Sequence, residues 1–284
     1  MSKDYKNKPA AGTGSEVAKT GAGAVATFDY GADKGTGLND MKGSDLAIPF
    51  LNILQSNSPQ VEANNPDGAK AGLLLNSVTQ TLIDGKKGKG FIPCHREDLY
   101  MEWTPRDNGG GLVGRHAPDS KEVKDAIASS DKKFGKLKTK AGNDLVETHY
   151  VYGLTLDDDG AVDGFAVVAC SSTKIKPFKN WFTAMYMIKG QPPLFAHRVK
   201  IVTVSEKNKK GSYYNFQFNP LKGDTMSSLI DPATEGNLLM QAKDFRDMVV
   251  SGAAKAAFET QANDAAPNGV DEEVDPEGDG KAPF

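Results

Sequence analysis

The residues from Lys174 to Lys210 combine positive charge with aromatic rings. This stretch holds nine bases and a single acid, Glu206, in a chain whose formal net charge is -3. Lysine and arginine side chains attract the phosphates of a polyanion, and nucleic acid is the obvious polyanion for such a surface. Aromatic rings inside and just after the stretch offer faces on which unpaired bases stack. The pattern predicts a surface that binds single-stranded nucleic acid, and an acidic protein partner is the alternative.

We expect the contacts with DNA to come from basic and aromatic side chains of this region. They are Lys174, Lys176, Lys179, Trp181, Tyr186, Lys189, Arg198, Lys200, Lys207, Lys209, Lys210 and Tyr213. For any one lysine of the turn at residues 205–212, a solvated side chain without a ligand is an equally good interpretation. Stacking and phosphate contacts need neither a catalytic residue nor a cofactor.

The conformation of residues 175–186 decides the role of Trp181. Phe178, Trp181, Phe182 and Met185 follow the spacing of one apolar helix face. In a helix these four side chains belong to the core, which is the interpretation that we favour. In an extended segment, Trp181 would instead be the main platform for stacking, and oligo-dT would quench its fluorescence.

Two alternating segments, 197–204 and 212–218, predict a β-hairpin with a basic turn. Because side chains of a strand alternate between its faces, Tyr214, Phe216 and Phe218 share one face. We expect that face to be inside, which leaves Tyr213 exposed on the other.

The rest of the sequence predicts a mainly β, α+β protein. Strand-like pieces are separated by glycine turns, and the basic turn at residues 85–90 is typical of a β-hairpin. Residues 157–160 lack the spacing of a calcium-binding loop and favour a plain hairpin turn. Short helices are expected at 120–130 and around a stripe made by Leu238, Ala242, Phe245 and Val249.

Composition divides the chain into three zones. Residues 1–43 are a Gly/Ala-rich arm without hydrophobic periodicity, which we expect to be disordered. Residues 44–262 form the folded domain, with an insertion at about 104–142. Residues 263–284 form an acidic tail, also expected to be disordered. With 38% hydrophobic residues in 284, the chain can bury a sizeable core.

Groups typical of enzymes are scattered in this sequence. His95, His116, His149 and His197 show no zinc-binding spacing, and the sequence GGGLVG lacks the Gly-Lys-Ser/Thr of a phosphate-binding loop. Cys94 and Cys170 favour buried thiols in a reducing compartment. We therefore expect no catalysis and no metal. No segment has the length of a membrane span or the apolar core of a signal peptide, which favours a cytoplasmic protein.

The tail carries the most specific similarity to a known family. From Asp264 to Phe284 it contains seven acids and one base, and it ends in Pro283 and Phe284. A β-rich body with a basic, aromatic surface and such a tail resembles the single-stranded-DNA-binding proteins of bacteria and their phages. The segments SSTKIKPFKNWFTAMYMIKG and GSYYNFQF are also similar to phage-encoded proteins of this type.

The resemblance implies an OB-like antiparallel barrel that coats DNA without chemistry. It also implies that the tail recruits replication or recombination proteins through Asp279, Pro283 and Phe284 while it screens the DNA site. Bacterial members end in Ile-Pro-Phe after a run of Asp, whereas here Ala282 precedes Pro283 and Lys281 interrupts the acids.

We therefore expect a non-enzymatic protein that binds and coats single-stranded DNA without strong sequence preference during phage-type replication or recombination. If it is phage-encoded, it would act in the host cytoplasm, and a homo-oligomer is compatible with the sequence. The alternative is a virion structural or interaction protein whose basic stretch docks an acidic partner. A recombination nuclease is a third, weaker interpretation, which metal-dependent cleavage would reveal.

Overall fold

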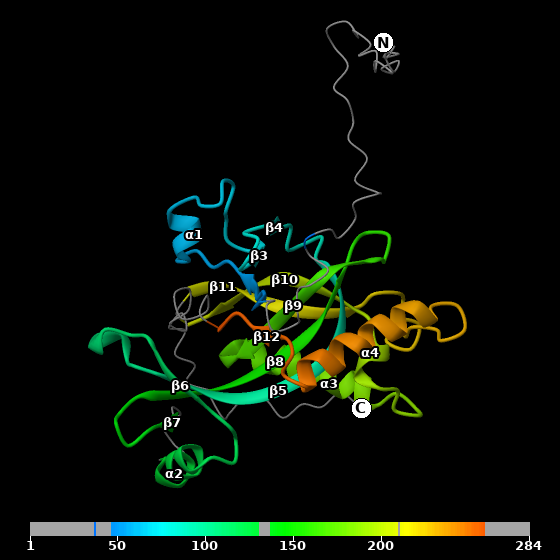
Figure 1. Ribbon diagram of the computed structural model, residues 1–284. Helices are drawn as coiled ribbons and strands as arrows, with labels where there is room; N and C mark the ends of the chain where they lie inside the picture. The colour runs from blue at the N-terminus through cyan, green and yellow to red at the C-terminus, as the bar shows by residue number, and fades with distance from the viewer. Residues whose placement is uncertain (1–36, 38–46, 131–136, 210, 259–284) are drawn as a thin grey trace, which may run out of the picture. The chain divides into compact units, whose positions relative to one another are not determined.

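The structure is a computed structural model that describes residues 37, 47–130, 137–209 and 211–258 (Figure 1). The chain divides into two units, Met1–Asp40 and Met41–Phe284, and apart from Gly37 every described residue belongs to the second. The expected acidic tail lies outside the described residues, as does nearly all of the expected N-terminal arm.

The elements are mostly antiparallel strands, with four α-helices among the described residues. In chain order they are β1 (Ala47–Ile48), β2 (Leu51–Ile53), α1 (Pro59–Glu62), β3 (Leu74–Asn76), β4 (Leu82–Ile83), β5 (Lys89–Trp103), η2 (Arg106–Asn108), β6 (Leu112–His116), α2 (Lys121–Ser129), β7 (Leu137–Lys138), β8 (Asp144–Leu156), β9 (Val162–Ser171), η3 (Ser172–Lys174), α3 (Ile175–Tyr186), η4 (Leu194–Ala196), β10 (Val199–Asn208), β11 (Gly211–Pro220), α4 (Gly236–Val250) and β12 (Lys255–Ala256). No helix in the described ranges is long and apolar enough to cross a membrane.

A seven-stranded sheet organises the body around two long strands. β5 and β8 pair over nearly their whole lengths, from Gly90 opposite Leu156 to Trp103 opposite Asp144. The order is β11-β10-β5-β8-β7, with β6 added to β5 and β9 added to β8. The mainly β prediction is confirmed.

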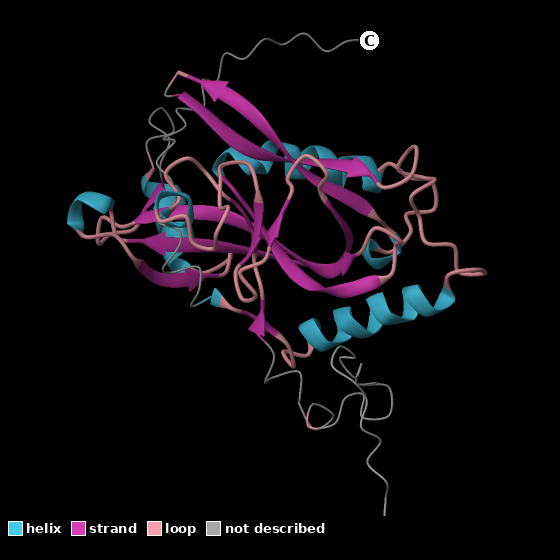
Figure 2. Ribbon diagram, turned by 90° about the horizontal axis from the view of Figure 1, so that it is seen from above, coloured by secondary structure: helices cyan, strands magenta, loops and turns pink. Residues whose placement is uncertain are grey.

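Both faces of this sheet are buried, each against its own hydrophobic cluster. On β8, Tyr150 and Tyr152 enter one cluster while Val151 between them enters the other. Phe245 of α4 belongs to the first cluster and Trp181 of α3 to the second. The two longest helices accordingly lie on opposite sides of the strands (Figure 2). Such two-sided burial explains why the paired segments at residues 150–154 of β8 and 165–170 of β9 lack charged residues.

The described strands do not close into a barrel. β11 pairs only with β10 among the described strands, and at the other edge β9 pairs with β8 and makes a single bridge from Val167 to Phe50. A small barrel has one interior face, whereas this sheet has a core on each face. The expected OB-like barrel is therefore not confirmed.

A β-bulge interrupts β5 between Pro93 and His95. Proline cannot donate a ladder hydrogen bond, so a bulge is a usual place for it within a sheet. The opposing residue is Gly153, and a Cβ there would lie 2.2 Å from the carbonyl oxygen of Ile92 and 2.4 Å from the Phe91 ring. Only glycine allows the two backbones to approach this closely.

The expected insertion extends the same sheet. β6 pairs with β5, and β7 pairs with β8, at the end of the sheet where α2 packs (Figure 1). The Ser120 hydroxyl accepts a hydrogen bond from the Val123 N–H, which caps α2 and confirms the expected short helix. Val123, Ala126 and Leu145 form a small core of their own.

The smaller sheet, in the order β2-β3-β4, corrects the expected hairpin at residues 85–90. β4 pairs with β3, and β5 pairs with strands of the large sheet, so the basic turn connects two sheets. Thr203 of β10 fixes this connection, because its N–H donates to the Gly85 carbonyl and its hydroxyl donates to the Gly72 carbonyl. The turn at residues 157–160 does join β8 and β9 as a hairpin, as expected.

The two ends of the described body meet in a parallel pair. Ala47 of β1 lies opposite Lys255 of β12, and the Ala257 N–H donates to the Ile48 carbonyl. Phe258 then packs edge-on against Phe50, with ring centroids 5.6 Å apart. The C-terminal end is thus part of the core up to Phe258.

Candidate nucleic-acid interface

Helix α3 separates an apolar face from a basic face. Phe178, Trp181 and Met185 are buried, and Phe182 is partly buried against the same cluster, which confirms the helical interpretation of their spacing. Pro177 stands in the first turn, where its missing N–H removes no helical hydrogen bond. The other sides of the helix expose Lys176, Lys179 and Tyr186.

The β10–β11 hairpin is also formed as predicted, with Val199 opposite Pro220 and Asn208 opposite Gly211. Phe216 is buried, and Tyr214 and Phe218 are partly buried on the same face. The other face holds Glu206, whose carboxylate accepts hydrogen bonds from the Tyr213 hydroxyl at 2.7 Å and the Asn215 amide at 3.1 Å. Glu206, the single acid of the basic stretch, is therefore already hydrogen-bonded to side chains of the hairpin itself.

Helix α3 lies along β11. Before the helix, the Thr173 carbonyl accepts a hydrogen bond from the Asn215 side chain, and the Lys174 ammonium lies 5.4 Å from the centroid of the Phe216 ring. Further along, Trp181 stacks on Phe218 with centroids 4.3 Å apart and an interplanar angle of 11°. These contacts place the beginning of α3 towards the hairpin tip.

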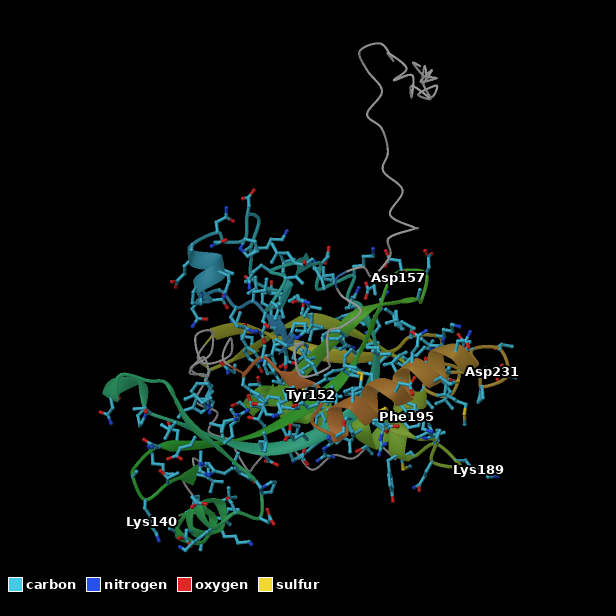
Figure 3. The ribbon with its side chains drawn as sticks, in the orientation of Figure 1. Lys140, Tyr152, Asp157, Lys189, Phe195 and Asp231 are labelled. Carbon is cyan, nitrogen blue, oxygen red and sulfur yellow. The ribbon has the colours of Figure 1, made fainter. Side chains whose placement is uncertain are left out.

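We call the exposed surface formed by these two elements the α3–hairpin face. It consists of Lys176, Lys179, Tyr186, Lys189, Lys207 and Lys209. Tyr186 is 71% exposed, and the next residue, Met187, is 77% exposed. Lys189, in the turn after α3, lies at the margin of the body (Figure 3).

Several bases elsewhere in the described chain are paired with carboxylates. Lys87 bonds to Asp158 at 2.5 Å, and Lys121 bonds to Asp125 at 2.6 Å. By contrast, none of the five lysines of the α3–hairpin face has a carboxylate within 4.0 Å in the part of the chain that the structure describes. No described carboxylate therefore neutralises their charge by direct contact, and the described body leaves it available to an anion.

Two of the predicted DNA contacts are structural residues. Trp181 is 6% exposed and has one face covered by Phe218, so it cannot stack on a base in this conformation. Arg198 is 7% exposed, and its guanidinium bonds to Glu235 at 2.6 Å and to the Ser228 and Leu229 carbonyls. Arg198 thus fastens the loop before α4 to β10. For Trp181 this agrees with the core interpretation that the helical spacing favoured over a stacking role. For Arg198 it is a correction, because the composition of the stretch did not show that Glu235 and the loop before α4 occupy its guanidinium.

The remaining predicted residues occupy intermediate positions. Lys174, Lys200 and Tyr213 are half-buried, and burial holds the pKa of Lys174 below its usual range. The Tyr213 ring is therefore less accessible than that of Tyr186. Lys210, like Asp279, Pro283 and Phe284, lies outside the described residues.

One basic residue beside this face was missed by the sequence analysis. Arg96 of β5 places its guanidinium over Phe178 and Phe182 of α3, at 5.2 and 5.4 Å from their ring centroids. It lies far upstream of the basic stretch, between His95 and Glu97, where the local sequence gives no sign of basic clustering. Only the packing of α3 against the sheet brings it here.

The groups that could support chemistry are dispersed among the described residues. Cys94 and Cys170 are free and buried, and burial raises the pKa of each thiol to about 12. In those ranges no group of three or more His, Cys, Asp or Glu side chains is arranged to hold a metal ion. His149 and His197 are buried, each with one ring nitrogen that lacks a hydrogen-bond partner.

The chain matches the model of a known protein family. The model of the family described as Pam3 phage gp34-like protein matches residues 17–255, a range that includes α3, the β10–β11 hairpin and most of both hydrophobic clusters. Curated proteins and solved structures gave no match. The family is named after a phage protein, which suggests a bacteriophage origin. Since the match covers most of the chain, the chain belongs to the Pam3 phage gp34-like family.

Proposed function

We propose that this chain binds and coats single-stranded DNA through the α3–hairpin face, without strong sequence preference, during phage DNA replication or recombination. The observation that carries the proposal is the set of five exposed lysines, without carboxylate partners in the described structure, that accompany an exposed tyrosine ring. The role is one of binding and requires no catalytic group.

Exposed aromatic rings favour a single strand over a duplex. In a duplex each base face is covered by its neighbours, whereas an unpaired base can stack on a protein ring, which contributes about 1–3 kcal/mol per base. Tyr186 offers such a ring, while the lysines on either side can follow the phosphates. The proposal does not depend on a closed OB barrel, because the contacts come from one helix and one hairpin.

We also propose that the C-terminal segment regulates this face. Residues 264–284 carry seven acids and one base, and residues 174–210 carry nine bases and one acid. Opposite charges on one chain attract each other when the segment that joins them can reach. DNA would displace the acidic segment and release Asp279, Pro283 and Phe284 for a replication or recombination protein.

The test is a titration of labelled oligo-dT, and of a labelled matching duplex, with the protein. Fluorescence anisotropy measures the affinity for each at about 50 and about 200 mM salt. Anisotropy is the suitable signal because Trp181 and Trp103 are both buried and need not report on stacked bases. We expect the single strand to bind more tightly than the duplex, and salt to weaken its binding.

Matched variants locate the site. Lys176→Gln with Lys179→Gln should reduce the slope of log K against log salt by about 1.4, because each phosphate contact with a single strand contributes about 0.7. The control pair, Lys243→Gln with Lys255→Gln, removes two exposed charges from α4 and β12 and should leave the slope unchanged.

Two outcomes would contradict the proposal. Equal binding of both DNA forms would indicate a nonspecific polyanion surface. No DNA binding would leave the basic face as a dock for an acidic protein, as expected of a virion or interaction protein.

A further inference from the structure

We propose that Arg96 and Phe182 form a nucleobase-stacking subsite at the border of the α3–hairpin face. The inference rests on the proposed single-stranded-DNA function and specifies where a base would be held. It adds a residue of β5 to a surface otherwise built from α3 and the hairpin.

The guanidinium of Arg96 is fixed on two sides. One of its faces covers the rings of Phe178 and Phe182, at 5.2 and 5.4 Å from their centroids. Its Nε donates to Asp98 Oδ1 at 2.8 Å, and its Nη2 donates to Asp98 Oδ2. The paired donors of arginine match a carboxylate in one plane, so Asp98 sets the orientation of the guanidinium.

Asp98 is itself held by a second group. His149 Nδ1 lies 2.7 Å from Asp98 Oδ1, and the imidazole stacks on Phe178 with centroids 4.4 Å apart and an interplanar angle of 11°. Burial raises the pKa of Asp98, but the hydrogen bonds from Arg96 and His149 outweigh it and keep that pKa below its usual range. Each of the four side chains, Arg96, Asp98, His149 and Phe178, contacts the next, and Phe178 contacts Arg96 again. These contacts hold the plane of the Arg96 guanidinium before any ligand binds.

The exposed part of Arg96 suits a base better than a phosphate. The side chain keeps 39% of its surface accessible although one face and one edge of the guanidinium are in contact with other side chains, so part of Arg96 stays open to a ligand. Asp98 compensates the positive charge, which weakens attraction for phosphate, whereas stacking on the planar group needs no net charge. Arginine planes are known platforms for unpaired bases. A platform that is already fixed loses little entropy when it binds.

The neighbouring residues can serve the adjacent nucleotide. Phe182 lies one helical turn before Tyr186, a rise of about 5.4 to 6 Å along the helix. Lys179 follows Phe178 directly, on the exposed side of α3. The stacking position on Arg96 thus lies over the helix about one turn from Tyr186, and Lys179 lies on the same helix.

The experiment compares oligo-dT with an abasic strand of the same length, which has the phosphates but no bases. Arg96→Lys keeps the charge and removes the plane. We expect it to weaken oligo-dT binding about 5- to 100-fold, the range expected for one lost stacking contact, and to leave binding of the abasic strand unchanged. Arg246→Lys is the matched control, because Arg246 of α4 also bonds to a carboxylate, that of Asp247, and is 42% exposed. Arg246→Lys should leave the affinity for both strands unchanged.

A second variant covers the case in which Arg96→Lys does not fold. Phe182→Leu leaves the Arg96 pair with Asp98 in place and should show the same selective loss for oligo-dT, with a thermal midpoint near that of the wild type. The subsite is wrong if the wild type binds oligo-dT and both folded variants bind it with unchanged affinity. It is also wrong if the variants lose affinity equally for oligo-dT and for the abasic strand. If the wild type itself does not bind oligo-dT, the proposed function fails and the subsite fails with it.

Discussion

At the scale of single residues, the same residue type serves different purposes in this chain. Lys87 pairs with Asp158, whereas Lys179 faces solvent without a carboxylate partner in the described residues. Trp181 fills the core, and Tyr186, five positions later, is exposed. The sequence shows which charges and rings exist in the stretch, but the partner of each depends on elements from elsewhere. Candidate contacts therefore need to be chosen by exposure and partners rather than by residue type.

Two histidines should make stability depend on pH near neutrality. Burial lowers the pKa of His197, although the Pro192 carbonyl opposes the shift, and burial also lowers the pKa of His95. Each is therefore neutral in the folded state at a pH where the unfolded chain already binds a proton. The folded state should lose stability as pH falls below the unfolded value of 6.5.

Thermal midpoints between about pH 7.5 and about pH 5.5 measure this loss. His197→Gln should flatten the dependence, and the double variant with His95→Gln should flatten it further. A wild type that becomes more stable as pH falls through this interval would show that the sign is wrong.

At the scale of elements, the sequence correctly predicted those helices and strands whose formation depends on the spacing of nearby residues. The apolar period of 3.6 located α3 and α4, and the alternation of two located the β10–β11 hairpin. The hairpin predicted at residues 85–90 was wrong, because pairing depends on which distant strand lies beside each edge. Whether the sheet closes into a barrel depends on such long-range packing, and so does the approach of Arg96 to α3. No local sequence pattern could have predicted either.

Gly153 tests the close approach at the bulge of β5. Gly153→Ala should destabilise the protein by about 1–3 kcal/mol, since the new methyl group would overlap the Ile92 carbonyl and the Phe91 ring. Denaturant unfolding measures the change. Gly236→Ala is the control, because the space around Gly236 is open, and it should cost nothing. Equal stability of the two variants would mean that the strands can separate at the bulge without cost.

At the scale of the whole molecule, charge is distributed unevenly along the chain. A protein of net charge -3 concentrates bases on the α3–hairpin face and acids after residue 263. The two hydrophobic clusters hold α3 and α4 on opposite sides of the sheet, so the basic face is separated from α4 by the sheet and its two cores. We therefore expect the acidic segment to affect DNA binding through electrostatic attraction, without a conformational change in the folded domain.

Deletion of residues 264–284 should tighten oligo-dT binding about 5-fold or more at low salt, the lower end of typical coupling between two sites. The cut leaves Phe258 and the β1–β12 pair intact, so the body should unfold at the same temperature as before. The gain should shrink as salt screens the attraction.

A segment of the same length with Asn and Gln in place of the acids is the control, and it should behave like the deletion. If that neutral segment still weakens binding as the natural one does, length rather than charge is responsible. Unchanged affinity after the deletion would count against regulation by this segment altogether.

The parallel pair of β1 and β12 also constrains when the protein can fold during its synthesis. Ile48 and Phe50 leave the ribosome early and are fully buried in the finished structure, yet part of their cover consists of Ala256 and Phe258. These partners follow every other element of the described body in the sequence, so they are synthesised after all of them. Until then, one side of the sheet keeps an uncovered apolar surface, which a nascent chain exposes to aggregation or to chaperones. The core on this side is therefore complete only when the last described strand, β12, has joined the first, β1.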